Sequence, residues 1–144
     1  MVALVTLAWA GYLLITRDQA AQDRDDALAA ARQYAVDLTT YDFSSVDADF
    51  RRFARHGTKA FQASYAATIA AAKPAIVKAQ SRSLGTVVGA GLESYGGGRA
   101  GVLLAVDQEI RSANQTGASV DRSRIRMTLR HVGNGWLVSS VQVF

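Results

Sequence analysis

The chain opens with an apolar run from Val2 to Ile15, which ends where Arg17 and Asp18 introduce charge. A helix needs roughly 20 apolar residues to span a bilayer, so this run falls short unless the helix begins upstream of Met1 or the membrane thins around it. We interpret residues 1–16 as a transmembrane anchor shortened at its start. Two alternatives stay open, a cleaved signal peptide and a helix buried in the core of a soluble protein.

Beyond a short charged stretch, apolar residues recur at the helical spacing of three and four. They are Ala27, Ala31, Tyr34, Leu38 and Tyr41. Neither proline nor glycine interrupts residues 12–56, so the anchor is expected to run straight into this helix. A break is expected near residues 41–45, where aspartate and serine favour a turn.

Two more helices are expected before residue 80. The apolar face of the first comprises Val46, Phe50 and Phe53. Gly57 is its expected C-cap, because glycine adopts the left-handed conformation that ends many helices. Thr58 should open the next helix, in which Pro74 should cause a kink or an end.

The second half of the chain changes to a period of two. Segments 83–95 and 100–110 flank the turn Gly96–Gly98 and predict a hairpin. Segment 122–132 alternates, and Gly133–Gly135 should join it to a last strand. Its apolar positions are Ile125, Met127 and Leu129. Three helices followed by a block of strands predict an α+β fold, with a curved four-stranded antiparallel sheet around the helices.

Composition removes several classes of function. The chain has no cysteine, which excludes disulfides and thiolate zinc sites. The net charge of +4 comes from the C-terminal half, since residues 73–144 carry nine Lys/Arg against four Asp/Glu and residues 1–72 carry seven against eight. The basic segment lacks interleaved aromatic residues that would stack on bases. No phosphate-binding or dinucleotide motif is present. We therefore expect no cofactor and no nucleic-acid partner.

Three segments resemble a known family. They are residues 26–50 after the apolar run, 102–110 and 122–144. With them the chain resembles the mammalian-cell-entry-associated (Mce-associated) membrane proteins of actinobacteria. Those proteins are similar in fold to the nuclear-transport-factor-2-like (NTF2-like), or cystatin-like, cone, which is also used by an assembly factor of type IV secretion systems.

The resemblance implies a single-pass protein of the cytoplasmic membrane, with residues 17–144 as an extracytoplasmic domain. It implies a non-enzymatic accessory subunit of a lipid or sterol importer, acting through contacts with membrane and transporter subunits. The alternatives are a ligand-binding or enzymatic cone domain and a secretion-system scaffold. The transported molecule and any self-association stay open.

A cone of this kind often encloses a pocket, where related enzymes use aspartate or a tyrosine–aspartate pair for proton transfer. The candidates are Tyr34, Asp37, Tyr65 and Asp107. The tyrosines equally suit the core and the aspartates equally suit solvent, so we predict no catalytic residue. Tyr34, Tyr65 and Trp136 are kept as candidate pocket residues.

Three arginines share one face of the predicted third strand, namely Arg124, Arg126 and Arg130. Alternate side chains of a strand point the same way, so these arginines should form a row facing solvent. The row could bind lipid headgroups or an acidic partner, or simply discourage aggregation. His56 and His131 have no ligand-type partner at helical spacing and are predicted to be surface residues without metal.

Overall fold

The structure is a computed structural model that describes residues 2–144, with side chains from Tyr12 onward. Met1, and with it the question of the native start, lies outside the described residues. The elements in chain order are α1 (Val2–Thr39), β1 (Tyr41–Asp42), α2 (Val46–Ala54), α3 (Lys59–Lys78), β2 (Arg82–Gly96), β3 (Arg99–Arg111), β4 (Ser119–Val132) and β5 (Gly135–Val143). The predicted α+β class is confirmed.

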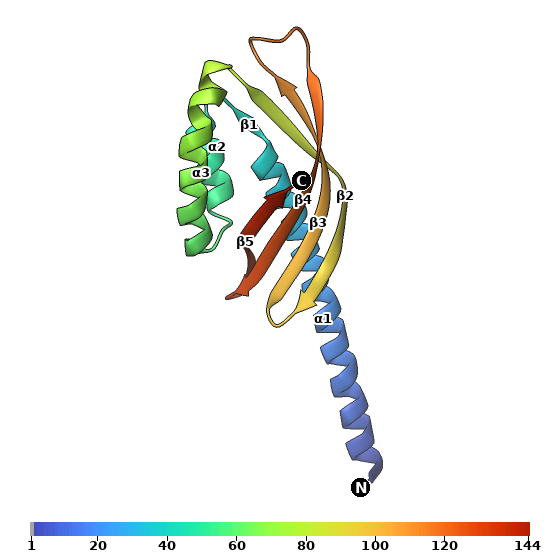
Figure 1. Cartoon of the computed structure of the whole chain (residues 1–144). Coiled ribbons are helices and arrows are strands. Elements are labelled where there is room, and N and C mark those ends of the chain that lie inside the picture. The colour runs from blue at the N-terminus through green and yellow to red at the C-terminus, as the bar shows by residue number, and fades with distance from the viewer. Residues whose placement is uncertain (1) are drawn as a thin grey trace.

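Helix α1 is the longest element, and its first half projects away from the strands (Figure 1). It runs without interruption into the domain, as the absence of proline predicted. Its second half packs on β2 and β3 through Ala27, Ala31 and Ala35, which are completely buried. Short alanine side chains let the helix axis approach the sheet closely.

None of the helices in residues 2–144 is long and apolar enough to cross a membrane. The transmembrane helix predicted at residues 1–16 is therefore not shown.

The sheet has five antiparallel strands in the order β1-β2-β3-β4-β5, and the predicted count of four is wrong. The missed strand is β1, in which Tyr41 pairs with Ser83 and Asp42 pairs with Arg82. Two residues are too short to display a period of two, so the sequence pattern carried no signal for it. The predicted hairpins β2–β3 and β4–β5 are both present.

The core lies between α1 and one face of the sheet, which we call the inner face. It is formed by Val102, Leu104, Val106, Ile125, Met127, Leu129, Trp136 and Val138. The predicted alternation is confirmed over residues 102–106 of β3 and 123–129 of β4, where every second residue is buried. The opposite, outer face carries the arginines of β4.

One prediction about a helix end is wrong, and of the two outcomes predicted for Pro74 the structure excludes the helix end. Helix α2 ends at Ala54 with Arg55 as its cap, so Gly57 is not the C-cap. Gly57 instead lies in a bridge to β5, where any side chain would collide with the ring of Phe61. The chain around it exchanges backbone hydrogen bonds with Val138. Pro74 does not end α3, which continues to Lys78.

Candidate functional site

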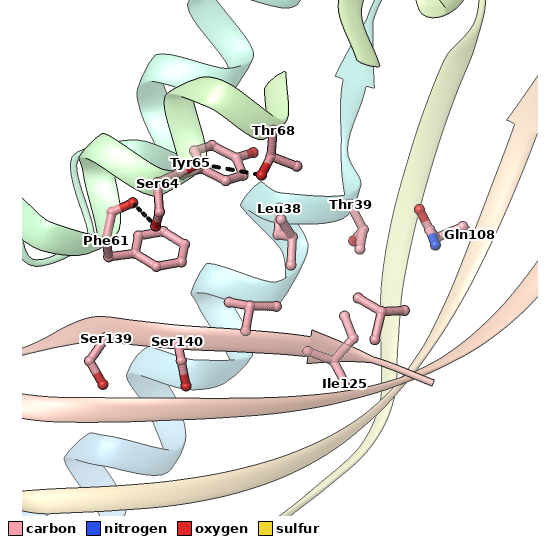
Figure 2. Close-up of a pocket in the computed structure, with 12 residues that line it drawn as sticks. Leu38, Thr39, Phe61, Ser64, Tyr65, Thr68, Gln108, Ile125, Ser139 and Ser140 are labelled. Atoms are coloured by element: carbon pink, nitrogen blue, oxygen red, sulfur yellow. Dashed lines mark hydrogen bonds between the residues drawn. The ribbon is translucent and has the colours of Figure 1, made fainter. Parts of the chain in front are cut away.

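A cavity of about 470 Å³ lies between the end of α1, helix α3 and the strands β4 and β5 (Figure 2). Its apolar wall comes from Leu38, Phe61, Ile125 and Val141. Its polar wall comes from Ser64, Tyr65, Thr68, Gln108 and Ser139. No charged residue lines it within the described part of the chain. This volume falls within the range of small-molecule sites in proteins.

Tyr65 is the most constrained of the lining residues. Its ring stacks on Phe61 at 5.5 Å between centroids and meets Phe53 edge-on at 5.0 Å. Its hydroxyl is buried and finds no hydrogen-bond partner among residues 2–144. Burial raises the pKa of the phenol well above its ordinary value, because the anion would be poorly solvated there.

The other two candidate pocket residues lie elsewhere, on the side of α1 that faces β5. The Tyr34 hydroxyl donates to the backbone oxygen of Trp136 at 2.8 Å. Trp136 is only 6% exposed, and its ring packs against Tyr95 and His131. Neither Tyr34 nor Trp136 lines the cavity, so the structure does not bring the three candidates together.

Tyr34 belongs instead to a polar cluster that joins α1 to α2. His56 stacks on the Tyr34 ring at 4.2 Å, and its Nε2 lies 2.9 Å from Asp37 Oδ2. Asp37 Oδ1 also accepts from Arg52 Nε at 3.3 Å. The Arg52 guanidinium in turn donates to Asp49 at 2.7 Å. We call Tyr34, Asp37, Asp49, Arg52 and His56 the α1–α2 cluster.

The cluster corrects the prediction for His56, which is not a plain surface residue. Its side chain is 30% exposed and held by Asp37 and Tyr34. Within the cluster, burial alone raises the pKa of Asp49, but hydrogen bonds from the Asp42 amide and from Arg52 outweigh it and lower that pKa. Burial raises the pKa of Tyr34. His131 is exposed, as predicted.

The arginine row of β4 lies on the outer face but is not uniform. Arg126 forms two hydrogen bonds of 2.8 Å to Glu93 and lies over the Phe144 ring. Those hydrogen bonds lower the pKa of Glu93. Arg130 lies opposite Arg99 of β3, so two like charges face each other across the strands.

The remaining candidate, Asp107, lies on the outer face of β3, because its neighbours Val106 and Gln108 lie on the inner face. It does not line the cavity. Neither candidate aspartate therefore reaches the cavity beside Tyr65. Within residues 2–144, no group of three or more histidine, aspartate or glutamate side chains could hold a metal ion.

Comparison with known sequences identifies the family. Residues 1–143 match the profile of the family described as "Uncharacterized protein Rv1363c/MT1408-like". The chain belongs to this family. The match to the Rv1363c/MT1408-like family does not extend to Mce association, which stays a prediction. No curated protein matches the chain.

Solved structures show the same fold as this member of the Rv1363c/MT1408-like family. An IcmL-like type IV secretion system protein from Legionella pneumophila has a TM-score of 0.73 at 9% identity, covering 84% of this chain and 91% of that one. CagV, a VirB8 homolog from Helicobacter pylori, has a TM-score of 0.66 at 10% identity, and the match covers 81% of this chain and 94% of CagV. An NTF2-like protein with a cystatin-like fold from Novosphingobium aromaticivorans has a TM-score of 0.62 at 15% identity, and the match covers 90% of this chain and 86% of that one. The NTF2-like fold is thereby confirmed.

Proposed function

We propose that this protein is a non-enzymatic assembly subunit of a complex in the cell envelope. The N-terminal part of α1 attaches it to the cytoplasmic membrane, and the α+β domain lies on the extracytoplasmic side. More specifically, we propose that the complex is an Mce-type lipid or sterol importer. The observation that carries the proposal is the continuity of α1 from an apolar start to the centre of the domain core.

The geometry of α1 supports attachment through its first turns. Tyr12, Leu14 and Ile15 are 66, 63 and 61% exposed on the part of the helix outside the domain (Figure 1). An exposed apolar stretch of this kind calls for a membrane or a protein partner to cover it. Since the helix is unbroken up to the buried Ala27 and Ala31, attachment of its start also sets the orientation of the domain.

The similar structures favour an assembly role over an enzymatic one. Two of them are named as type IV secretion proteins, and one further neighbour is the periplasmic domain of DotI. At such low identity they report the fold alone, so a secretion scaffold stays a second candidate. The sequence resemblance favours the importer as the partner.

The outer face of the sheet is the proposed contact surface. Arg126 is already neutralised by Glu93, which leaves Arg124 and Arg130 as the cations of the predicted row without an ion pair in residues 2–144. Repulsion between Arg130 and its cross-strand neighbour Arg99 would fall if an anionic group approached both. A partner carboxylate or a lipid phosphate would supply that anion.

Membrane attachment is tested by fractionating cells that produce the full chain. The chain should sediment with membranes and resist a salt wash. A variant with Leu13→Gln, Leu14→Gln and Ile15→Gln keeps the helix propensity but loses apolar surface, and it should move to the soluble fraction. Equal distribution of both proteins would contradict the proposed attachment.

The partner is tested by cross-linking in membranes followed by purification of the chain. Importer permease or substrate-binding subunits should co-purify, whereas secretion-system subunits would favour the second candidate. The double variant Arg124→Glu, Arg130→Glu should lose the cross-links, and Arg55→Glu, an exposed arginine at the end of α2, serves as the matched control. Unchanged cross-links in the double variant would exclude the outer face as the contact surface.

A further inference from the structure

We propose that the cavity beside α3 binds an uncharged amphiphilic molecule, with the Tyr65 hydroxyl as the group that fixes its polar end. This goes beyond the assembly role, because it gives the domain a ligand of its own. The proposal depends on two observations, the buried phenol without a partner and the uncharged wall around it.

The phenol is the first observation. A buried hydroxyl without a hydrogen bond loses its hydration and gains nothing in return, so native proteins pair nearly all such groups. The Ser64 and Thr68 hydroxyls on α3 donate to the backbone oxygens of Phe61 and Ser64, and neither accepts from the phenol. Figure 2 shows these bonds on the wall that Tyr65 shares. The phenol oxygen is covered in this structure, so a small shift of the neighbouring side chains would bring it into contact with a carbonyl or hydroxyl oxygen in the cavity, which would then accept from it.

The position of the phenol is fixed before any ligand arrives. Its ring is held by Phe61 on one side and by the edges of Phe53 and Phe50. Such a packed aromatic cluster leaves the side chain little rotational freedom, so binding would cost little further ordering. The hydroxyl is therefore a preorganised donor.

The wall chemistry sets the class of ligand. A carboxylate or phosphate would leave water for a cavity that offers no cation, which is unfavourable. The apolar side chains of Leu38, Ile125 and Val141 suit a hydrocarbon or ring body, and hydroxyls and one amide suit a single polar group. The ligand class is a neutral lipid-like alcohol or ketone. Exposed Ser64 and Thr68 border the cavity, so it is reached directly from solvent.

The experiment uses the full chain carrying Leu13→Gln, Leu14→Gln and Ile15→Gln, which removes the exposed apolar start of α1, and the variants below are made in that background. It titrates this chain with prodan, a neutral naphthalene whose fluorescence reports its surroundings and whose carbonyl accepts hydrogen bonds. We expect saturable binding with blue-shifted emission. Tyr65→Phe removes only the donor and should weaken binding about fivefold, the usual effect of one hydrogen bond. Tyr34→Phe, which removes a hydroxyl outside the cavity, is the matched control and should bind prodan normally.

A second variant and a competitor pair keep the result interpretable. Thr68→Trp fills the cavity from an exposed position on α3 and should abolish binding without disturbing the core. 1-Decanol should displace prodan, whereas decanoate, which differs by its charge, should be at least about tenfold weaker. No saturable binding, equal binding by Tyr65→Phe, or equal displacement by decanoate would overturn the proposal. Because the soluble Leu13→Gln, Leu14→Gln, Ile15→Gln background is titrated in detergent-free buffer, these outcomes are independent of membrane attachment and of any envelope partner.

Discussion

Tyr34 of α1 and Tyr65 of α3 differ in what their hydroxyls contact. The Tyr34 hydroxyl donates to the Trp136 backbone oxygen and its ring stacks on His56, within a cluster in which each side chain has a polar partner. The Tyr65 ring packs against three phenylalanines, and its hydroxyl has no hydrogen-bond partner in residues 2–144. Satisfied polar groups stabilise a fold, whereas a buried unsatisfied group lowers stability and is retained where it serves a site. The α1–α2 cluster around Tyr34 therefore serves stability, and the cavity beside Tyr65 serves the proposed ligand binding.

Overpacking at the contact between α1 and the sheet should give the largest effect. Ala31→Leu adds three carbon atoms where the side chain is completely buried, and it should reduce the free energy of unfolding by about 3 kcal/mol. Urea denaturation followed by circular dichroism measures the loss. The control, Ser64→Leu, adds a similar volume at the open cavity wall and should cost less than about 1 kcal/mol. Equal losses would mean that the cavity wall at Ser64 is packed as tightly as the contact between α1 and the sheet at Ala31.

The α1–α2 cluster should show the next largest effect. Asp37→Asn keeps the shape of the side chain but removes the charge that accepts from Arg52 and faces His56. We expect a loss of about 2 kcal/mol, typical of a hydrogen-bonded charge. Asp107→Asn is the control, because Asp107 has no ion pair or hydrogen bond from its side chain within residues 2–144. A loss as small as the control's would show that the cluster adds nothing to stability.

Tyr34→Phe isolates one hydrogen bond of the cluster. The ring still stacks on His56, but the Trp136 oxygen loses its donor. The free energy of unfolding should fall by about 1 kcal/mol, and the loss should be smaller still if Asp37→Asn is already present. Strict additivity of the two losses would mean that Tyr34 and Asp37 act separately rather than as one cluster.

Much of this arrangement follows from the sequence, because periodicity reports which side of an element is buried. The unbroken α1, the two hairpins and the inward parity of Ile125, Met127 and Leu129 all followed from it. Those features depend on local spacing and on the absence of proline, which a single chain displays directly.

The features that periodicity missed are contacts between distant segments. His56 is held by Asp37, and Arg126 is neutralised by Glu93, which lies 33 residues earlier. The two-residue strand β1 exists only because β2 is there to pair with it. Tyr34 and Tyr65 looked alike as members of apolar helical faces, since a period gives the buried side but not the partner of a hydroxyl.

Tyr65→Phe should give the smallest change in the free energy of unfolding, and its sign distinguishes Tyr65 from Tyr34. If the hydroxyl is buried without a partner, its removal should leave stability unchanged or raise it by up to about 1 kcal/mol, the reverse of the sign expected for Tyr34→Phe. Urea denaturation of both variants under one set of conditions compares them directly. A loss of about 1 kcal/mol in Tyr65→Phe would mean that the hydroxyl has a stabilising partner, and the contrast between Tyr34 and Tyr65 would fail.

Alkaline pH sharpens the same test. Burial holds the pKa of Tyr65 in the folded chain above the value of about 10 that it takes when unfolded. The unfolded chain therefore loses this proton first, and the contribution of the neutral phenol to stability, complete below about pH 10, declines as the pH rises further. Between about pH 8 and about pH 11, wild-type stability should fall more steeply than that of Tyr65→Phe, which lacks the proton. Parallel pH profiles would mean that the phenol is hydrated in the folded chain, which would contradict its burial without a partner.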